Sequence, residues 1–252
     1  MKRIVCILAL LLSVVSGCGA RVDRYKAEVV ARYPHDRAAY TQGLFFRGAD
    51  LIESTGGFGN SMLRVVDLQT GKASQTVSFK RKYFGEGSVI FDGALYVLTW
   101  TNKLVFLYDP QTLEYRKSFS YPREGWGLTT DGESLIASDG SSRLYFMDAN
   151  LGVKRTLDVK LDGRSVKHLN ELEYIDGRIW ANIYLSDLIV IIDPSDGHVC
   201  ATVDCTGLLP AKLKLPDTDV LNGIACDPVT GKIYLTGKNW PELYEIKLKP
   251  IK

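Results

Sequence analysis

The stretch that decides the fold is residues 88–119, which read SVIFDGALYVLTWTNKLVFLYDPQTLEYRKSF. It contains four runs rich in β-branched and aromatic residues, separated by Asp92-Gly93, Thr101-Asn102 and Asp109-Pro110-Gln111-Thr112. Such runs favour strands, and Gly, Pro, Asn and Asp favour the turns between them. Four short strands that meander through tight turns are typical of one blade of a β-propeller.

The start of this stretch recurs along the chain, with glycine as the usual second residue. The five copies are Gln42-Gly43-Leu44-Phe45-Phe46, Glu86-Gly87-Ser88-Val89-Ile90, Trp126-Gly127-Leu128-Thr129-Thr130, Asn170-Glu171-Leu172-Glu173-Tyr174 and Asn222-Gly223-Ile224-Ala225-Cys226. Their second positions lie 44, 40, 44 and 52 residues apart, a period that indicates a propeller or solenoid. The sequence therefore predicts an all-β, five-bladed β-propeller. Residues 21–39 are expected to supply a strand that closes the ring, and the longest interval an insertion loop at its rim.

Equivalent positions of a closed ring point towards one centre, where a small polar ligand could bind. The residues at the first position of the repeats are Gln42, Glu86, Trp126, Asn170 and Asn222. A second equivalent position, at the end of the second strand of a repeat, holds Trp100, Tyr184 and Lys238. These residues are the candidates for a site.

Glu86 is the candidate for acid–base chemistry. It lies in Tyr83-Phe84-Gly85-Glu86-Gly87, where the glycines allow a tight turn and aromatic walls would raise the pKa of the carboxyl. The alternative is a carboxylate that only accepts hydrogen bonds from neighbouring loop amides. Lys238 could stabilise negative charge developing on an oxygen, or it could be a solvated surface lysine.

The other candidates also allow two interpretations. Trp100 and Trp126 could pack against the aliphatic part of a ligand, or belong to the core between blades. The amides of Gln42, Asn170 and Asn222 could bind an amide or ammonium group, or tie loops together across the channel.

The first residues predict export. Lys2-Arg3 is a positive n-region, and residues 4–15 are apolar but too few to span a bilayer. Val15-Ser16-Gly17-Cys18 has the form of a bacterial lipobox, so we expect residues 1–17 to be a lipoprotein signal peptide and Cys18 to be lipidated. The alternative is an ordinary secretory signal. Either way the domain acts outside the cytoplasm, and a lipidated Cys18 would anchor it to a membrane of the cell envelope.

The mature chain is expected to be neutral and to form one domain. Its 31 Lys and Arg fall to 29 without Lys2 and Arg3 and then equal the 29 Asp and Glu, which argues against a nucleic acid partner. Residues 18–26 are expected to be a tether and residues 27–250 the single catalytic domain, because no low-complexity linker divides them.

The mature cysteines and histidines do not form a metal-binding pattern. Cys200, Cys205 and Cys226 are an odd number, so one disulfide and one thiol is an open possibility. His35, His168 and His198 are scattered and expected on the surface or in loops, so no protein-bound metal is predicted.

Eight motifs in order resemble the plant and bacterial glutamine cyclotransferases, also called glutaminyl-peptide cyclotransferases, from about residue 27 to residue 248. The motifs are Tyr40-Thr41-Gln42-Gly43-Leu44, Glu53-Ser54-Thr55-Gly56, Tyr83-Phe84-Gly85-Glu86-Gly87, Leu98-Thr99-Trp100, Glu124-Gly125-Trp126-Gly127-Leu128, Leu169-Asn170-Glu171-Leu172-Glu173, Leu221-Asn222-Gly223-Ile224-Ala225 and Thr236-Gly237-Lys238-Asn239-Trp240-Pro241. The resemblance implies a five-bladed propeller and an aminoacyltransferase that requires no metal or other cofactor.

The resemblance also implies the reaction and the roles of several residues. The N-terminal glutaminyl residue of a peptide or protein would become pyroglutamyl, with release of ammonia. Glu86 matches the catalytic carboxylate that takes a proton from the attacking amine and delivers it to the leaving ammonia. Lys238 and Gln42 match pocket positions that polarise the carbonyl or hold the amide.

The aromatic positions match the family with one departure. Phe84, Trp100 and Trp126 match its aromatic wall, and Asn170 matches a binder of the substrate's amide or amine. Tyr184 stands where the family commonly has Trp, and its smaller ring and hydroxyl bear on side-chain preference and affinity. The alternative function is a non-catalytic propeller that binds a ligand or protein, although such a scaffold has no need for Glu86 beside aromatic residues. The protein is expected to act as a monomer.

Overall fold

The computed structural model describes residues 22–251, whose regular secondary structure is almost entirely β-strand. The predicted signal peptide and Cys18 lie outside the described residues. Within residues 22–251 the helical content is a single 3₁₀ turn, η1 (Ala211–Leu213), and no helix there is long and apolar enough to cross a membrane. The predicted all-β class is confirmed.

The first three repeats each form a four-stranded antiparallel sheet in chain order. The first sheet is β2 (Thr41–Arg47), β3 (Asp50–Thr55), β4 (Met62–Val66) and β5 (Ala73–Ser78). The second is β6 (Gly85–Phe91), β7 (Ala94–Thr99), β8 (Leu104–Tyr108) and β9 (Tyr115–Ser120). The third is β10 (Leu128–Thr130), β11 (Leu135–Ala137), β12 (Arg143–Met147) and β13 (Val153–Asp158), followed by the hairpin β14 (Lys160–Leu161) and β15 (Arg164–Ser165).

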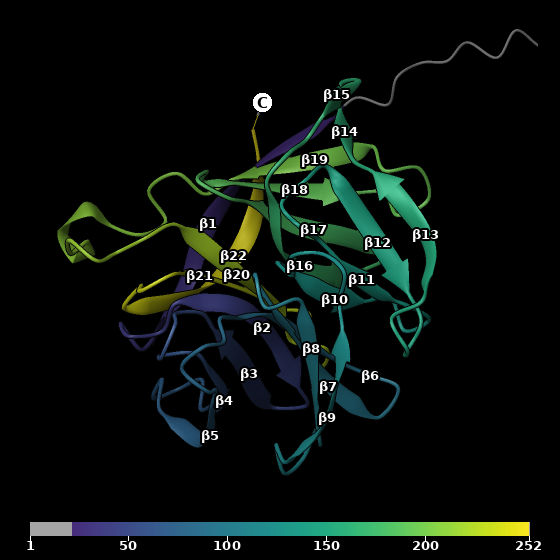
Figure 1. Ribbon diagram of the computed structural model, residues 1–252. Helices are drawn as coiled ribbons and strands as arrows, with labels where there is room; N and C mark the ends of the chain where they lie inside the picture. The colour runs from purple at the N-terminus through teal and green to yellow at the C-terminus, as the bar shows by residue number, and fades with distance from the viewer. Residues whose placement is uncertain (1–21, 252) are drawn as a thin grey trace, which may run out of the picture.

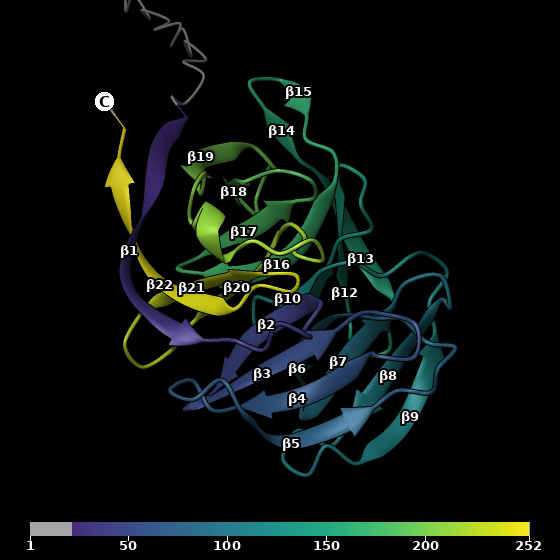
Figure 2. The same ribbon diagram turned by 90° about the vertical axis from the view of Figure 1, so that its left-hand side faces the viewer.

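The last two repeats share an eight-stranded sheet with the N-terminal strand, in the order β16-β17-β18-β19-β1-β22-β21-β20. Its strands are β1 (Asp23–Pro34), β16 (Leu169–Ile175), β17 (Arg178–Ile183), β18 (Leu188–Ile192), β19 (Val199–Asp204), β20 (Leu221–Cys226), β21 (Ile233–Gly237) and β22 (Glu242–Pro250). β1 pairs antiparallel with β22 and in parallel with β19, and Figure 2 shows it (purple) beside β22 (yellow). Residues 23–26, expected in the tether, therefore belong to the sheet, because they pair with β19.

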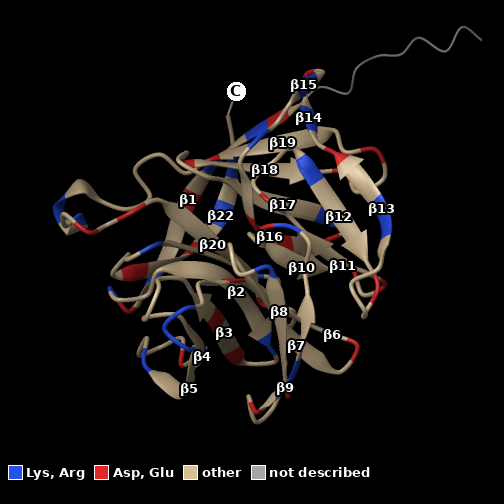
Figure 3. Ribbon diagram, in the orientation of Figure 1, with Lys and Arg blue, Asp and Glu red and all other residues tan. Residues whose placement is uncertain are grey.

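The first strands of the five repeats meet around a common centre, so the sheets form a nearly closed arrangement (Figure 1). β2 contacts β6, β6 contacts β10, β10 contacts β16, β16 contacts β20 and β20 contacts β2. Hydrophobic cores fill the spaces between neighbouring sheets, as where Leu98 and Leu107 pack with Leu135 and Met147. Figure 3 shows basic and acidic residues interspersed over the strands in this view, without a face of one sign.

The first position of the repeat lies in a β-bulge in four of the five first strands. The register shifts fall between Thr41 and Gly43, Gly85 and Ser88, Leu169 and Leu172, and Leu221 and Ile224. A bulge breaks the strict alternation of a strand and redirects one side chain. The residues redirected in this way are Gln42, Glu86, Asn170 and Asn222.

The repeat glycines are required because the first strands approach one another closely. A Cβ on Gly127 would lie 2.0 Å from the carbonyl oxygen of Asn170, and a Cβ on Gly87 would lie 2.5 Å from the amide nitrogen of Leu128. Both contacts are to backbone, which cannot move aside as a flexible side chain can.

Gly127→Ala is therefore expected to lower the free energy of unfolding by about 3 kcal/mol, since overpacking forces backbone shifts. Chemical denaturation measures this effect. Gly163→Ala is the control, because Gly163 has a φ of +76° but no atom within 4 Å of an added Cβ. It should cost only about 1 kcal/mol for the backbone conformation. Equal losses in the two variants would contradict the close approach.

The fourth repeat has Glu171 where the others have glycine. Its buried carboxyl accepts hydrogen bonds from the amides of Leu44 in β2, at 3.3 Å, and Ile224 in β20, at 2.9 Å. Burial and the nearby Glu173 raise the pKa of Glu171 well above its usual value, while the two amides oppose the shift. The side chain thus links three first strands near the centre.

Candidate active site

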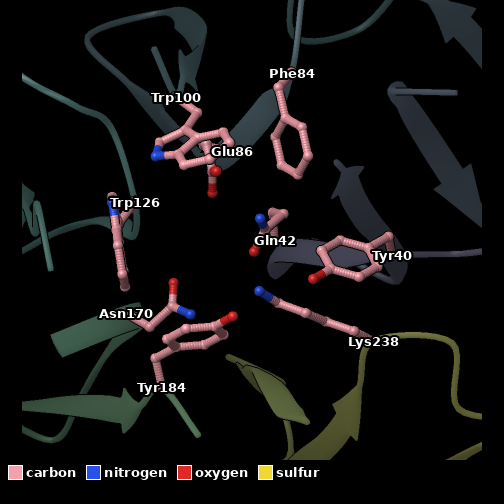
Figure 4. Close-up of a pocket in the computed structure, with 9 residues that line it drawn as sticks. All are labelled: Tyr40, Gln42, Phe84, Glu86, Trp100, Trp126, Asn170, Tyr184 and Lys238. Atoms are coloured by element: carbon pink, nitrogen blue, oxygen red, sulfur yellow. The ribbon is translucent and has the colours of Figure 1, made fainter. Parts of the chain in front are cut away.

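A cavity of about 190 Å³ is lined by three of the four bulged residues, Gln42, Glu86 and Asn170. Its walls, shown in Figure 4, are Tyr40, Gln42, Phe84, Glu86, Trp100, Trp126, Asn170, Tyr184 and Lys238. The structure therefore brings together eight of the predicted site residues and adds Tyr40. The cavity has the size of a single amino-acid residue rather than of a folded peptide.

Two structural positions supply most of these side chains. Gln42, Glu86 and Asn170 come from the bulges of β2, β6 and β16, and Trp126 precedes β10. The ends of second strands supply the others, since Trp100 follows β7, and Tyr184 and Lys238 come just after β17 and β21. Equivalent positions of different repeats thus meet in one place, as the repeat predicted.

Hydrogen bonds hold the backbone of Glu86, whereas its carboxyl has no hydrogen-bond partner among the described residues. The hydroxyl of Ser54 donates to the Glu86 carbonyl at 2.6 Å, and the amide of Gly87 donates to the carbonyl of Trp126 at 2.7 Å. Among residues 22–251 no hydrogen bond reaches the Glu86 carboxyl, so the alternative of a carboxylate held by loop amides finds no support there.

The surroundings of Glu86 favour its neutral form. Its side chain is buried, and burial raises the pKa well above the usual value of a carboxyl. The charge of Lys238 opposes this shift, and that of Glu124 adds to it. A carboxyl with a raised pKa can give and take a proton nearer neutral pH than an exposed one.

Lys238 is buried and is not the solvated surface lysine of the alternative interpretation. Its ammonium lies 4.7 Å from the ring centre of Tyr40 and 5.0 Å from that of Tyr184, distances at which aromatic faces attract a cation. Burial lowers the pKa of Lys238, while the charges of Glu86 and Asp219 raise it. Figure 4 shows the ammonium and the Glu86 carboxyl pointing into the same cavity.

The two tryptophans are oriented by one carboxylate that the sequence analysis did not select. Glu124 accepts hydrogen bonds from the indole nitrogens of Trp100, at 2.8 Å, and Trp126, at 3.3 Å. Trp126 also meets Tyr184 edge-on, with ring centres 5.6 Å apart. Glu124 could have been found from its place two residues before Trp126, in a motif already singled out.

Asn222 differs from its expected place, because it does not line the cavity but lies buried behind Gln42. Its side-chain amide donates to the carbonyl oxygen of Thr41 at 2.9 Å and to the side-chain oxygen of Gln42 at 3.2 Å. It therefore matches the interpretation of an amide that ties segments together, and it fixes the orientation of the Gln42 amide.

Tyr40 connects the cavity with the long loop between β19 and β20. Its hydroxyl donates to Asp219 at 2.7 Å, across 179 residues of sequence. The amide of Asp219 in turn donates to the carbonyl of Lys238 at 3.0 Å, so this end of the predicted insertion loop is fixed against the site. The sequence feature that could have identified Tyr40 as a cavity residue is its position two residues before Gln42.

Comparison with known proteins shows the family of the chain. A family model described as glutamine cyclotransferase matches residues 4–248. The chain belongs to this family. Over 227 residues it is 44% identical to the glutaminyl-peptide cyclotransferase of Arabidopsis thaliana, a match that covers 88% of this chain and 71% of the relative. It is also similar to the crystal structure of Myxococcus xanthus glutaminyl cyclase, with a TM-score of 0.86, 35% identity, and coverage of 92% of this chain and all of the other.

A buried ionic network contacts Thr41, the residue before Gln42. Glu53 accepts hydrogen bonds from Thr41 at 2.7 Å, from His35 at 3.0 Å, and from Arg64. Burial alone would raise the pKa of Glu53, but His35 and Arg64 lower it to about 2. Burial alone would likewise lower the pKa of His35, but Glu53 raises it. His35 lies in the loop between β1 and β2, which agrees with the expected loop position, but it is buried rather than on the surface, and Glu53 and the carbonyl of Trp240 pair both of its ring nitrogens.

The described part of the chain, residues 22–251, has no group of three or more His, Cys, Asp or Glu that could hold a metal ion. The thiols of Cys200, Cys205 and Cys226 are all free, so the disulfide left open by the sequence does not form among them.

Proposed function

We propose that this protein is a glutaminyl-peptide cyclotransferase that converts N-terminal glutaminyl residues of peptides or proteins to pyroglutamyl residues and releases ammonia. The observation that carries the proposal is that one buried carboxyl and one buried ammonium point into the same aromatic-walled cavity of single-residue size. The family membership of the chain supports the same reaction.

The reaction needs one proton to pass from nitrogen to nitrogen. The neutral α-amine of the substrate attacks its own γ-carboxamide carbon, a C–N bond forms, and the bond to the original amide nitrogen breaks. In our proposal the Glu86 carboxylate accepts the proton that the attacking nitrogen loses and then delivers it to the leaving nitrogen, which departs as ammonia. A carboxyl with a raised pKa suits both steps, because it is basic enough to accept and acidic enough to donate.

Lys238 and the amides complement the changing charge. The ammonium can stabilise the oxygen of the tetrahedral intermediate, whose negative charge is absent from the substrate amide. The Gln42 and Asn170 amides face the same cavity and can orient the carboxamide and the amine.

The aromatic walls bring the two ends of the glutaminyl residue together. An intramolecular reaction needs no second substrate, but the side chain must fold back on its own amine. Phe84, Trp100 and Trp126 restrict the conformations open to an aliphatic chain in a cavity of about 190 Å³. Tyr184, in place of the family's common Trp, leaves more space on one side.

We further propose a five-bladed propeller in which β1 completes the last blade, acting as a monomer on the outer side of a membrane. The cyclic contacts of the first strands and the pairing of β1 with β22 support the blades. The signal-like residues 1–17 and the lipobox-like Val15-Ser16-Gly17-Cys18 support a bacterial lipoprotein anchored through Cys18.

Mass spectrometry of a Gln-initiated peptide incubated with the full-length protein tests the function. We expect loss of the mass of one ammonia far faster than in a blank without protein, which is needed because glutamine also cyclises unaided. A rate equal to the blank across several peptides would overturn the proposal and favour the non-catalytic scaffold.

A further inference from the structure

An exposed aromatic side chain extends the wall of the cavity outwards. Phe58 lies between β3 and β4 and is 53% exposed, which is unusual for a phenylalanine. Its ring centre lies 5.4 Å from that of Phe84 and 6.5 Å from that of Trp100, and both of these residues line the cavity. The apolar wall therefore continues beyond the cavity onto the surface.

The loop that carries Phe58 is fixed to the strand that carries Glu86. The hydroxyl of Ser61 donates to the carbonyl of Gly57 at 2.8 Å and accepts the amide of Gly85, the first residue of β6, at 2.9 Å. Gly56 lies against the ring of Phe84, where a Cβ would come within 2.3 Å of a ring carbon. The Phe58 ring is thus held at a defined place beside the cavity.

A second exposed apolar residue adjoins the cavity. Leu185 directly follows the cavity residue Tyr184, is 70% exposed, and has a φ of +64°. This conformation is unfavourable for leucine, and strained residues of this kind cluster at ligand sites.

We propose that Phe58 forms a subsite for the second residue of the peptide substrate and favours an apolar or aromatic side chain there. This inference rests on the proposed function. The N-terminal glutaminyl residue fills the cavity, so the chain after it must leave through the mouth. The side chain of the second residue then reaches the first exposed surface beside the mouth, which includes the Phe58 ring.

The charges nearby define the competing outcome. Arg81 lies close to the same loop, with its Nε 3.8 Å from a Cβ built on Gly59. If the charge of Arg81 selected the second residue, the enzyme would prefer an acidic side chain there. The Phe58 subsite instead predicts a preference for Phe and Leu over both Gly and Asp.

The test compares kcat/KM of the full-length protein for Gln-Phe-Ala, Gln-Leu-Ala, Gln-Gly-Ala and Gln-Asp-Ala. For the wild type we expect values five- to tenfold higher with Phe or Leu than with Gly, the size of one aromatic contact. Phe58→Ala should bring the values for the Phe and Leu peptides down to that for Gln-Gly-Ala. Phe58→Leu should retain part of it.

Tyr115→Ala is the matched control, because Tyr115 is an aromatic residue with 58% exposure on β9, away from the cavity. It should keep the wild-type preference. A preference that persists in Phe58→Ala, a wild type that prefers Asp or shows no preference, or an equal loss for all four peptides would overturn the subsite. Absence of turnover above the blank for every peptide would instead overturn the proposed function.

Discussion

Glu86→Gln is expected to lower kcat by about 10²–10⁴-fold, the usual contribution of a positioned acid–base group. Gln has nearly the shape of Glu but cannot accept or deliver a proton. The fold should persist, because the Glu86 backbone is held by Ser54 and Trp126 and its carboxyl makes no hydrogen bond within residues 22–251. Steady-state cyclisation kinetics, with circular dichroism as the check on folding, measure the effect.

Glu173→Gln provides the control for this prediction. Glu173 is also a carboxyl with a pKa raised by burial, to about 8, but it lies in a separate cavity with Cys226. Its replacement should leave kcat near the wild-type value.

The activity of the wild type should fall on the acid side as Glu86 becomes protonated. Because the pKa of Glu86 is raised, this fall should occur at a higher pH than the usual pKa of a carboxyl, and Glu86→Gln should lack it. Near-normal turnover in Glu86→Gln would remove this residue from the mechanism.

Glu53→Ala is expected to lower the free energy of unfolding by about 3–5 kcal/mol, because it leaves the buried Arg64 and His35 without their shared partner. Activity should fall as well, since Glu53 holds Thr41 next to Gln42. Urea denaturation at neutral pH measures the loss. Asp158→Ala, which breaks an exposed pair with Arg143, should stay close to the wild type. A Glu53→Ala protein as stable as Asp158→Ala would contradict the importance of the network.

Glu53 and His35 in the same network determine how the free energy of unfolding changes with pH. The folded-state pKa of Glu53 is lowered to about 2, so its contribution is present above the usual carboxyl pKa of 4.5 and is lost as the pH falls towards 2. The pKa of His35 is raised, so its contribution is complete below 6.5 and is lost as the pH rises through the raised value. Between pH 4.5 and about 2 the wild type should lose free energy of unfolding as Glu53 protonates, and Glu53→Ala should lack this loss. Denaturation curves over this pH range measure it.

Most of the residues that line the cavity could be predicted from the sequence, because equivalent positions of the repeat supply them. The first position of the repeat lies in a bulge in β2, β6 and β16, where it carries Gln42, Glu86 and Asn170, and a glycine follows it in all repeats but the fourth. The second-strand ends that carry Trp100 and Lys238 follow from the same equivalence. These features depend on local pattern and on the period, which are both visible in one sequence.

The positions that the sequence missed depend on contacts between distant segments. Tyr40 reaches Asp219 in a loop without a repeat counterpart, and His35 pairs with Trp240 across 205 residues. Asn222 occupies an equivalent position in the repeat but turns to Thr41 and Gln42, because its strand lies directly beside β2. Such contacts follow from how the first and last repeats meet, which no local pattern specifies.

The pairing of β1 with β22 has a consequence for how the chain folds. Residues 25–34 pair with residues 242–250, so one of the first strands to be synthesised has to wait for the last. Contacts this distant in sequence make folding slow, and until β22 is present both β1 and β21 expose unpaired edges. We therefore expect a chain that ends before Glu242 to leave its largest sheet incomplete, to expose two unpaired strand edges to other copies, and to aggregate rather than form a smaller working protein.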